Sequence, residues 1–208
     1  MRVEVSTPSG PALVDLDRPR GTLRALLVLT HGAGGAVETA DLVAIRGVAL
    51  KAGIAVARVT QPYRVAGRRS PAAPSVQDTA WLAVVAAIRK RRGFGSVPLF
   101  VGGRSNGARV ACRTAVATGA AGVIALAFPL HPPGKPEASR LDELDAAGVP
   151  VLVVQGDRDP FGMPPPGDAR EIVVITGADH SLKRDPSTVA AVVLAAVTTM
   201  IGHARVGG

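Results

Sequence analysis

Apolar and polar positions alternate at the start of the chain and later give way to unbroken apolar runs. Residues Arg2–Val5 and Ala12–Asp17 alternate in polarity, and the turn-forming residues Pro8-Ser9-Gly10-Pro11 lie between them. This pattern predicts a β-hairpin. Ala25–Leu29 and Ile54–Val59 are unbroken apolar runs, which are typical of strands that are covered on both faces.

Segments with helical spacing separate further apolar runs along the rest of the chain. Helices are expected at Asp41–Lys51, Ser75–Arg92 (with Ser75 in the position of an N-cap), Ser105–Thr118, Arg140–Ala147 and Thr188–Ala204, and strands at Val97–Val101, Val123–Phe128, Val149–Val154 and Glu171–Ile175. Strands that alternate with helices predict an α/β fold, in which a mostly parallel twisted sheet carries helices on both faces. Such sheets bind ligands at the carboxyl ends of their strands, so functional residues are expected in the loops that begin there.

The length and composition fit one domain that buries a full core. The chain has 208 residues, of which 47% are apolar and only 3% aromatic, so the core is expected to consist of Ala, Val, Leu and Ile. Neither an internal repeat nor a linker interrupts the pattern. Residues 1–208 are therefore expected to form a single domain without a lid domain.

The charge and the cysteine content limit the classes of partner. The net charge is +8, mostly from arginine, but the arginines are spread along the sequence and few aromatic residues are present to stack on bases. Cys112 is the only cysteine, which excludes an internal disulfide. Met1–Gly10 contain no apolar run of the signal-peptide type, and the apolar stretch Val189–Ile201 is too short to span a bilayer, which favours a buried helix. We therefore expect a cytoplasmic protein, a monomer or a homodimer, with no nucleic-acid or membrane partner.

The turn after the expected strand Val97–Val101 has the sequence Gly103-Arg104-Ser105-Asn106-Gly107 and leads into a helix. This is the G-x-S-x-G pattern in its strand–turn–helix context, which is typical of a nucleophile elbow. The serine of such an elbow has a strained backbone, and side chains two positions before and after it would collide with the neighbouring strand and helix. The alternative is a glycine-rich turn in which Ser105 only caps the helix. The flanking strand and helix favour the nucleophile.

The glycine-rich segment Thr30–Gly35 follows an earlier buried strand. Acyl transfer requires two N–H donors that point at the developing oxyanion. One is expected from Asn106, the residue after the nucleophile, and the other from a loop of the His-Gly type. We assign the second donor to Ala33, with Gly34 as the alternative, and expect His31 to hold the loop in place.

A carboxylate and a histidine follow the last two expected strands of the sheet. The order Ser105, Asp159, His180 along the chain is the order in which this type of site occurs. His180 would take the serine proton, and the carboxylate would fix the imidazole tautomer and stabilise the imidazolium. Asp159 is preferred as the acid because it lies further into its loop, while Asp157 is the alternative and could instead bind its own turn. Asp179 adjoins His180 and is expected to point away from it.

With these residues assigned, the chain resembles the small α/β-hydrolases of the dienelactone-hydrolase-like type. Within them it is most similar to the branch that contains testis-expressed protein thirty and the third subunit of the non-specific-lethal chromatin complex. The resemblance rests on Leu29-Thr30-His31-Gly32-Ala33-Gly34-Gly35, Gly102-Gly103-Arg104-Ser105-Asn106-Gly107-Ala108-Arg109, Phe128-Pro129-Leu130-His131-Pro132-Pro133-Gly134, Gln155-Gly156-Asp157-Arg158-Asp159-Pro160-Phe161-Gly162 and Ala178-Asp179-His180-Ser181. It implies an α/β-hydrolase fold without a lid, and a triad of Ser105, Asp159 and His180. True dienelactone hydrolases use a cysteine nucleophile, so the serine in this elbow means that a dienelactone substrate is not implied.

These observations predict a carboxylesterase-like serine hydrolase that cleaves a small-molecule ester or thioester through an acyl-enzyme. The alternative is a non-catalytic interaction module on a hydrolase scaffold, as some members of the resembling branch are; a peptidase is disfavoured because the chain has no room for an added domain. No metal and no cofactor are expected. The dinucleotide-binding fingerprint fails because Val37 occupies the position of its third glycine.

The segment His131–Ser139, where larger hydrolases insert a lid, is short and predicts an open, shallow site. Four side chains are candidates for contact with the substrate: Arg64, Arg68, Arg104 and His131. The guanidinium groups could bind an anionic part of the substrate. The alternatives are a solvated basic loop for the arginines and a hydrogen bond within its own loop for His131.

Overall fold

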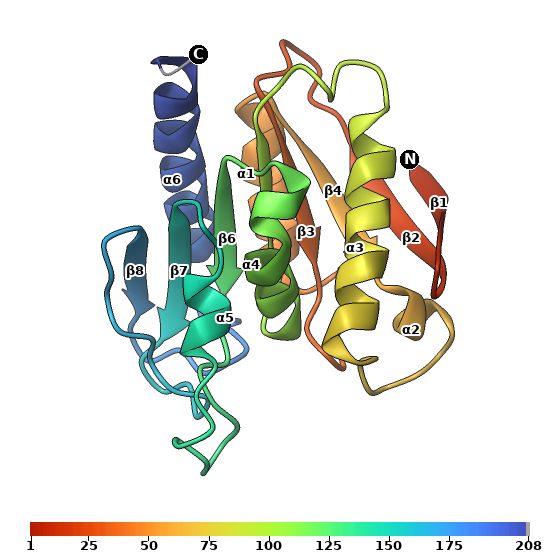
Figure 1. Ribbon diagram of the computed structural model, residues 1–208. Coiled ribbons are helices and arrows are strands. Elements are labelled where there is room, and N and C mark those ends of the chain that lie inside the picture. The colour runs from red at the N-terminus through yellow and green to blue at the C-terminus, as the bar shows by residue number, and fades with distance from the viewer. Residues whose placement is uncertain (207–208) are drawn as a thin grey trace.

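The computed structural model of the protein describes residues 1–206, which form one eight-stranded sheet with helices on both faces (Figure 1). The strands are β1 (Arg2–Thr7), β2 (Gly10–Asp17), β3 (Ala25–Thr30), β4 (Ile54–Thr60), β5 (Leu99–Arg104), β6 (Gly122–Leu126), β7 (Val151–Gly156) and β8 (Arg170–Ile175). The helices are α1 (Ala40–Lys51), α2 (Pro62–Val65), α3 (Pro74–Arg89), α4 (Asn106–Thr118), α5 (Leu141–Asp145) and α6 (Pro186–Val206).

The strand order is β1-β2-β4-β3-β5-β6-β7-β8. The predicted hairpin is confirmed, since β1 pairs antiparallel with β2, and β2 in turn pairs antiparallel with β4. All the other neighbours are parallel. The expected α/β fold with a mostly parallel sheet is therefore confirmed.

Alternate side chains of each central strand enter two different cores. Leu26 and Val28 of β3 face α3, α4 and α5, whereas Leu27 and Leu29 face α1 and α6. This alternation follows from the period of two along a strand. It explains why the central strands are buried at nearly every position up to the ends that the site residues follow.

Two elements differ from the sequence prediction near the site. Strand β5 continues to Arg104, because Gly102 and Gly103 pair with both neighbouring strands. Helix α3 begins at Pro74 and ends at Arg89, so Ser75 is inside the helix and does not cap it. The Arg89 guanidinium donates to the carbonyls of Phe94 and Val97, which stabilises the chain beyond the helix end.

Helix α6 is longer than expected. Its segment Pro186–His203 has a mean hydropathy of 1.5 and is long and apolar enough to cross a membrane, and 28% of this segment is buried. The expectation that this region is too short to span a bilayer is therefore wrong. In the structure α6 packs against α1 and the sheet, and one helix of this kind is weak evidence for a span because core helices pass the same test.

Candidate active site

Ser105 occupies a sharp turn between β5 and α4. Its backbone has φ 52° and ψ −116°, a conformation that L-residues rarely adopt. The Ser105 N–H donates to the Leu126 carbonyl at 2.9 Å, which anchors the turn to β6. Strain of this kind persists only where the surrounding structure enforces it, and it aims the Ser105 hydroxyl away from the sheet.

Close packing explains the two glycines of the turn. A Cβ at Gly103 would lie 2.6 Å from the Thr30 carbonyl oxygen, and one at Gly107 would lie 2.8 Å from the His31 carbonyl oxygen. Both distances are too short for real side chains. The expected steric reason for glycine at these positions is confirmed.

The structure brings Ser105, His180 and Asp159 into one hydrogen-bonded chain. His180 Nε2 lies 2.8 Å from Ser105 Oγ, and His180 Nδ1 lies 2.8 Å from Asp159 Oδ2. The Asp159 side chain is 1% exposed and the His180 side chain 23%, so the carboxylate is shielded while the imidazole reaches solvent. This arrangement can remove a proton from the serine hydroxyl and hold the resulting imidazolium.

Two further N–H donors fix the Asp159 carboxylate. Gln155 Nε2 donates to Oδ2 at 2.9 Å, and the Phe161 N–H donates to Oδ1 at 2.9 Å. Gln155 is fully buried and also donates to the carbonyls of Phe128 and Gly162. Sequence reasoning missed this role of Gln155, although a glutamine at the end of an apolar strand was a visible signal of a buried polar contact.

The other two aspartates near His180 accept hydrogen bonds from backbone N–H groups of the loops around them. Asp157 Oδ1 accepts the Gly177 N–H at 2.6 Å. Asp179 Oδ1 accepts the N–H and the hydroxyl of Ser181, and these hydrogen bonds hold the pKa of Asp179 below its usual value. Neither carboxylate is joined to the His180 ring by a hydrogen bond within residues 1–206.

Phe161 covers one face of the histidine. The rings of Phe161 and His180 have centroids 4.1 Å apart at an interplanar angle of 32°. The aromatic ring packs on the imidazole and favours the orientation that reaches both partners. The sequence analysis missed this residue too, because nothing local links position 161 to position 180.

The backbone N–H groups of Ala33, Gly34 and Asn106 have no acceptor among the described residues. The loop is close to the nucleophile, since a Cβ at Gly32 would lie 3.3 Å from Ser105 Cβ. The Asn106 side chain is held by Gln77, to which its Nδ2 donates at 2.6 Å. Gly34, the alternative donor, belongs to the exposed part of the same loop.

Tyr63 and His31 fix the shape of this loop. The Tyr63 hydroxyl donates to the Ala33 carbonyl at 2.8 Å, and burial raises the pKa of Tyr63 to about 12, so the hydroxyl stays protonated. His31 is fully buried; its Nδ1 contacts the Gly32 carbonyl at 2.7 Å and its Nε2 accepts the Gln61 N–H at 3.1 Å. Burial lowers the pKa of His31, which favours the neutral ring that these two contacts require.

Arg104 has partners that the sequence analysis did not foresee. Its Nη2 donates to the His180 carbonyl at 2.6 Å, and its Nε lies 3.3 Å from Asp41 Oδ2. The Asp41 side chain is 1% exposed and the Arg104 side chain 15%. The guanidinium thus links the elbow, α1 and the His180 loop. That Arg104 binds substrate stays a prediction.

The remaining candidates lie at the rim. His131 Nδ1 contacts the carbonyl of its neighbour Pro132 at 2.8 Å, which is the loop-bound alternative. Arg64 Nη1 donates to the Arg68 carbonyl at 3.0 Å, and Arg68 is exposed. No hydrogen bond joins these three side chains to Ser105 or His180 within the described part of the chain.

Cys112 is a residue of α4 and is fully buried in the core, and burial raises the pKa of its thiol to about 12. A thiol in this state is not available as a nucleophile. Ser105 is therefore the better candidate for the nucleophile.

Comparison with known proteins gives the family and the fold. A sequence model described as "Alpha/beta hydrolase domain" matches residues 23–200. No curated protein matches the chain. Among solved structures, Est1E from Butyrivibrio proteoclasticus is 18% identical, with 97% of this chain and 99% of that chain covered and a TM-score of 0.76.

Two further solved structures share the fold. A serine hydrolase without a lid from Xanthomonas campestris is 20% identical, with 92% of this chain and 90% of that chain covered and a TM-score of 0.72. Dienelactone hydrolase from Anabaena variabilis is 15% identical, with 93% and 94% covered and a TM-score of 0.72. At these identities the likeness shows the fold.

Proposed function

Because the chain belongs to the alpha/beta hydrolase domain family, we propose that it is a serine hydrolase that cleaves a small ester or thioester. The observation that carries this proposal is the chain of 2.8 Å contacts from Ser105 through His180 to Asp159. A non-catalytic module would have no need for the strained backbone at Ser105. The motifs around Ser105 and Asp159 also support our placement of the chain among the dienelactone-hydrolase-like proteins, in the branch that contains testis-expressed protein thirty and the third subunit of the non-specific-lethal complex.

The first half-reaction forms an acyl-enzyme. Ser105 Oγ attacks the carbonyl carbon while its proton passes to His180 Nε2, and the developing oxyanion accepts hydrogen bonds from the Ala33 and Asn106 N–H groups. The tetrahedral intermediate then breaks the bond to the leaving alcohol or thiol, which takes the proton from His180. Asp159 holds the ring in the tautomer that accepts the serine proton.

The second half-reaction releases the acid. A water molecule gives a proton to His180 Nε2 and attacks the acyl carbon, and the same two N–H groups bind the oxyanion again. Collapse of this intermediate breaks the bond to Ser105 Oγ, which regains its proton from His180. Every group therefore returns to its starting state.

The substrate we propose is a small molecule. The connection from β6 to α5, residues 127–140, is short, and it carries no helix or strand that could cover Ser105. Phe161 supplies an apolar wall on the His180 side of the site. A compact acyl or alcohol group fits such an open rim better than a long lipid chain, which needs an enclosed tunnel.

Labelling with a fluorophosphonate tests this proposal. We expect the folded wild-type protein to gain one covalent adduct, which peptide mapping locates at Ser105, because the probe phosphonylates a serine that is activated by a base. The Ser105→Ala variant should stay unlabelled. A folded wild-type protein that remains unlabelled would contradict the proposed function.

Arg104 holds the His180 loop through its hydrogen bond to the His180 carbonyl. Arg104→Met is therefore expected to displace His180 slightly and to lower kcat by roughly 10- to 100-fold, because small displacements of a catalytic group are costly. The KM for a neutral ester should change little. Arg104→Lys should restore part of the activity. The double variant Asp41→Asn/Arg104→Met serves as a folding control, because it leaves no unpaired charge in the buried position of Asp41. A loss confined to carboxylate-bearing esters would show instead that Arg104 binds substrate.

A further inference from the structure

Eight basic residues lie on three segments, residues 18–24, 51–53 and 89–92, which meet at the edge of the sheet opposite Ser105. They are Arg18, Arg20, Arg24, Lys51, Arg89, Lys90, Arg91 and Arg92, and we call them the cationic edge. Arg18 joins two of these segments, since its Nη1 donates to the Arg92 carbonyl at 3.0 Å and its guanidinium lies over the Phe94 ring. The Arg24 N–H joins the third segment by donating to the Gly53 carbonyl at 2.8 Å. Figure 1 shows the β2–β3 connection and the end of α3 at the same end of the molecule, at the top of the view.

The cationic edge accounts for the whole net charge of the protein. The chain has 24 basic and 16 acidic residues, and without these eight the two kinds are equal in number. Within the described residues, none of the eight side chains is within ion-pair distance of a carboxylate, whereas Arg46, Arg109 and Arg113 are paired with carboxylates. Exposed basic residues around the catalytic edge, such as Lys135 and Lys183, have no ion pair within the described residues either, but they lie on separate loops. Like charges are thus gathered here without compensation, which creates a strong local positive potential.

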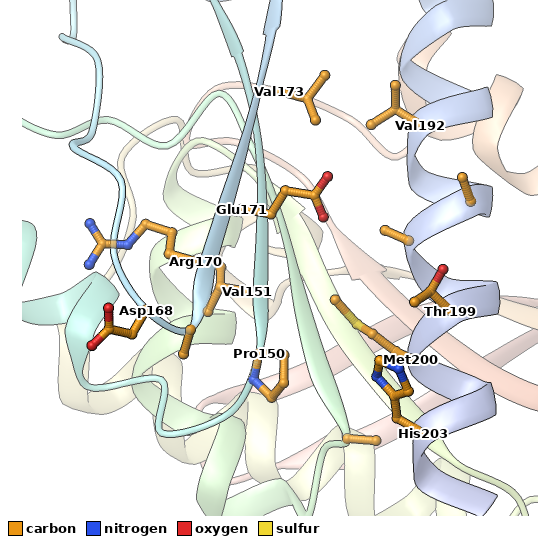
Figure 2. A pocket seen from close by; sticks show the side chains of 14 residues that line it. Pro150, Val151, Asp168, Arg170, Glu171, Val173, Val192, Thr199, Met200 and His203 are labelled. Atoms are coloured by element: carbon orange, nitrogen blue, oxygen red, sulfur yellow. The ribbon is translucent and has the colours of Figure 1, made fainter.

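An apolar groove adjoins the cationic edge. A hollow of about 440 Å³ between Arg24 and Arg89 extends to Ala121, which also lines a groove of about 870 Å³ between α6 and β8. Figure 2 shows Val192, Thr199 and Met200 of α6 on one side of this groove and Val173 on the other. The acidic Glu171 points into it from β8, the strand at the far end of the sheet from the cationic edge.

We propose that the cationic edge binds the surface of an anionic lipid bilayer, with the apolar side of α6 next to it at the level of the headgroups. Basic clusters bind anionic lipid through the summed attraction of their charges, and an adjacent apolar helix face adds contact with the interface. Arginine forms paired hydrogen bonds with phosphate. Of the six arginines, Arg18, Arg24 and Arg89 donate to backbone carbonyls. The other three, Arg20, Arg91 and Arg92, have no side-chain hydrogen bond within the described residues and are free to bind phosphate. Single-stranded nucleic acid is disfavoured because Phe94, the aromatic residue beside these segments, is fully buried and cannot stack on bases. Duplex DNA needs no stacking, so its binding is compared directly with that of vesicles.

This proposal replaces the expectation that the protein has no membrane partner. That expectation considered only a signal peptide and a membrane-spanning helix, and the arginines were taken as spread along the sequence. Folding instead brings residues 18–24, 51 and 89–92 together. Ser105 and His180 lie at the opposite edge of the sheet, so the bound protein would keep its catalytic site in water. Binding at the cationic edge is therefore independent of hydrolysis.

Vesicle co-sedimentation tests the proposal. We expect the protein to sediment with phosphatidylcholine vesicles that contain about one third phosphatidylglycerol, and not with vesicles of phosphatidylcholine alone, and to be released by high salt. The variant Arg20→Gln/Lys51→Gln/Lys90→Gln/Arg92→Gln should weaken binding by roughly fivefold for each charge removed. Its melting temperature and its esterase activity should stay unchanged, because these four side chains are exposed and contact no site residue.

A matched control removes the same number of charges elsewhere. Arg69, Lys135, Arg158 and Lys183 are exposed and lie in the loops around the catalytic edge, and their replacement by glutamine should leave vesicle binding nearly unchanged. Equal loss in the two variants would overturn the proposal, because net charge alone would then explain the binding. Failure of the wild type to bind anionic vesicles at low salt would also overturn it, and so would binding to duplex DNA in place of vesicles.

Discussion

Replacing Ser105 with alanine is expected to lower kcat/KM for p-nitrophenyl acetate by roughly 10⁴- to 10⁶-fold. The substitution removes only Oγ, the one atom that contacts His180 Nε2 at 2.8 Å. The backbone at Ser105 has φ 52°, which alanine tolerates as poorly as serine, so the packing of Gly103 and Gly107 continues to define the turn. What remains after the substitution is the weak assistance that the oxyanion donors give to direct attack by water.

Cys112→Ala is the matched control for this experiment, because Cys112 is the only thiol of the chain. Its buried position and its raised pKa place it outside the reaction, so this variant should keep wild-type kcat even if its melting temperature falls. Circular dichroism and thermal melting check that both variants are folded. Activity of Ser105→Ala above one tenth of wild type would show that another group is the nucleophile.

Much of the site could be predicted because its residues follow strand ends. The carboxyl ends of parallel strands share one edge of the sheet, so the loops that contain Ser105, Asp159 and His180 had to approach one another once the strands were identified. The glycines of the elbow were predictable for a similar reason, since the turn itself demands them. The positions of the triad residues could therefore be predicted from the order of strands and turns in the sequence.

The supporting contacts could not be predicted from the sequence. Arg104 is adjacent to Ser105 in the chain, yet its guanidinium contacts His180, and Phe161 covers the same histidine from another loop. Such pairings depend on side-chain directions that only the packed fold defines. The cationic edge is a similar case, because its residues are distant in the sequence and unremarkable singly.

Two elements were predicted wrongly or missed because they also depend on contacts that the sequence does not show. Strand β5 was expected to end at Val101, because glycine disfavours strands, but β3 and β6 on either side extend it to Arg104. Helix α2 (Pro62–Val65) is a single turn and was not predicted at all, since four residues cannot show a helical period. Tertiary contacts override local preference in both places.

Asp159→Asn is expected to lower kcat by roughly 10³- to 10⁴-fold, whereas Asp157→Asn should leave it nearly unchanged. In the wild type Asp159 Oδ2 lies 2.8 Å from His180 Nδ1 and so holds the proton on that nitrogen, leaving Nε2 free to accept the serine proton. An asparagine amide can present an N–H to Nδ1, which moves the ring proton to Nε2 and removes the base. Asp157 instead accepts the Gly177 N–H, and an asparagine carbonyl can do the same.

The two variants form a matched pair, because the same chemical change is made two residues apart in one loop. Steady-state kinetics on p-nitrophenyl acetate, with melting curves for both proteins, separates catalysis from stability. A large loss in Asp157→Asn with retained activity in Asp159→Asn would reverse the assignment of the acid. Equal losses would mean that the loop, and not one carboxylate, governs the reaction. The buried position of Asp159, with Gln155 and the Phe161 N–H fixing its two oxygens, is the physical reason to expect the first result.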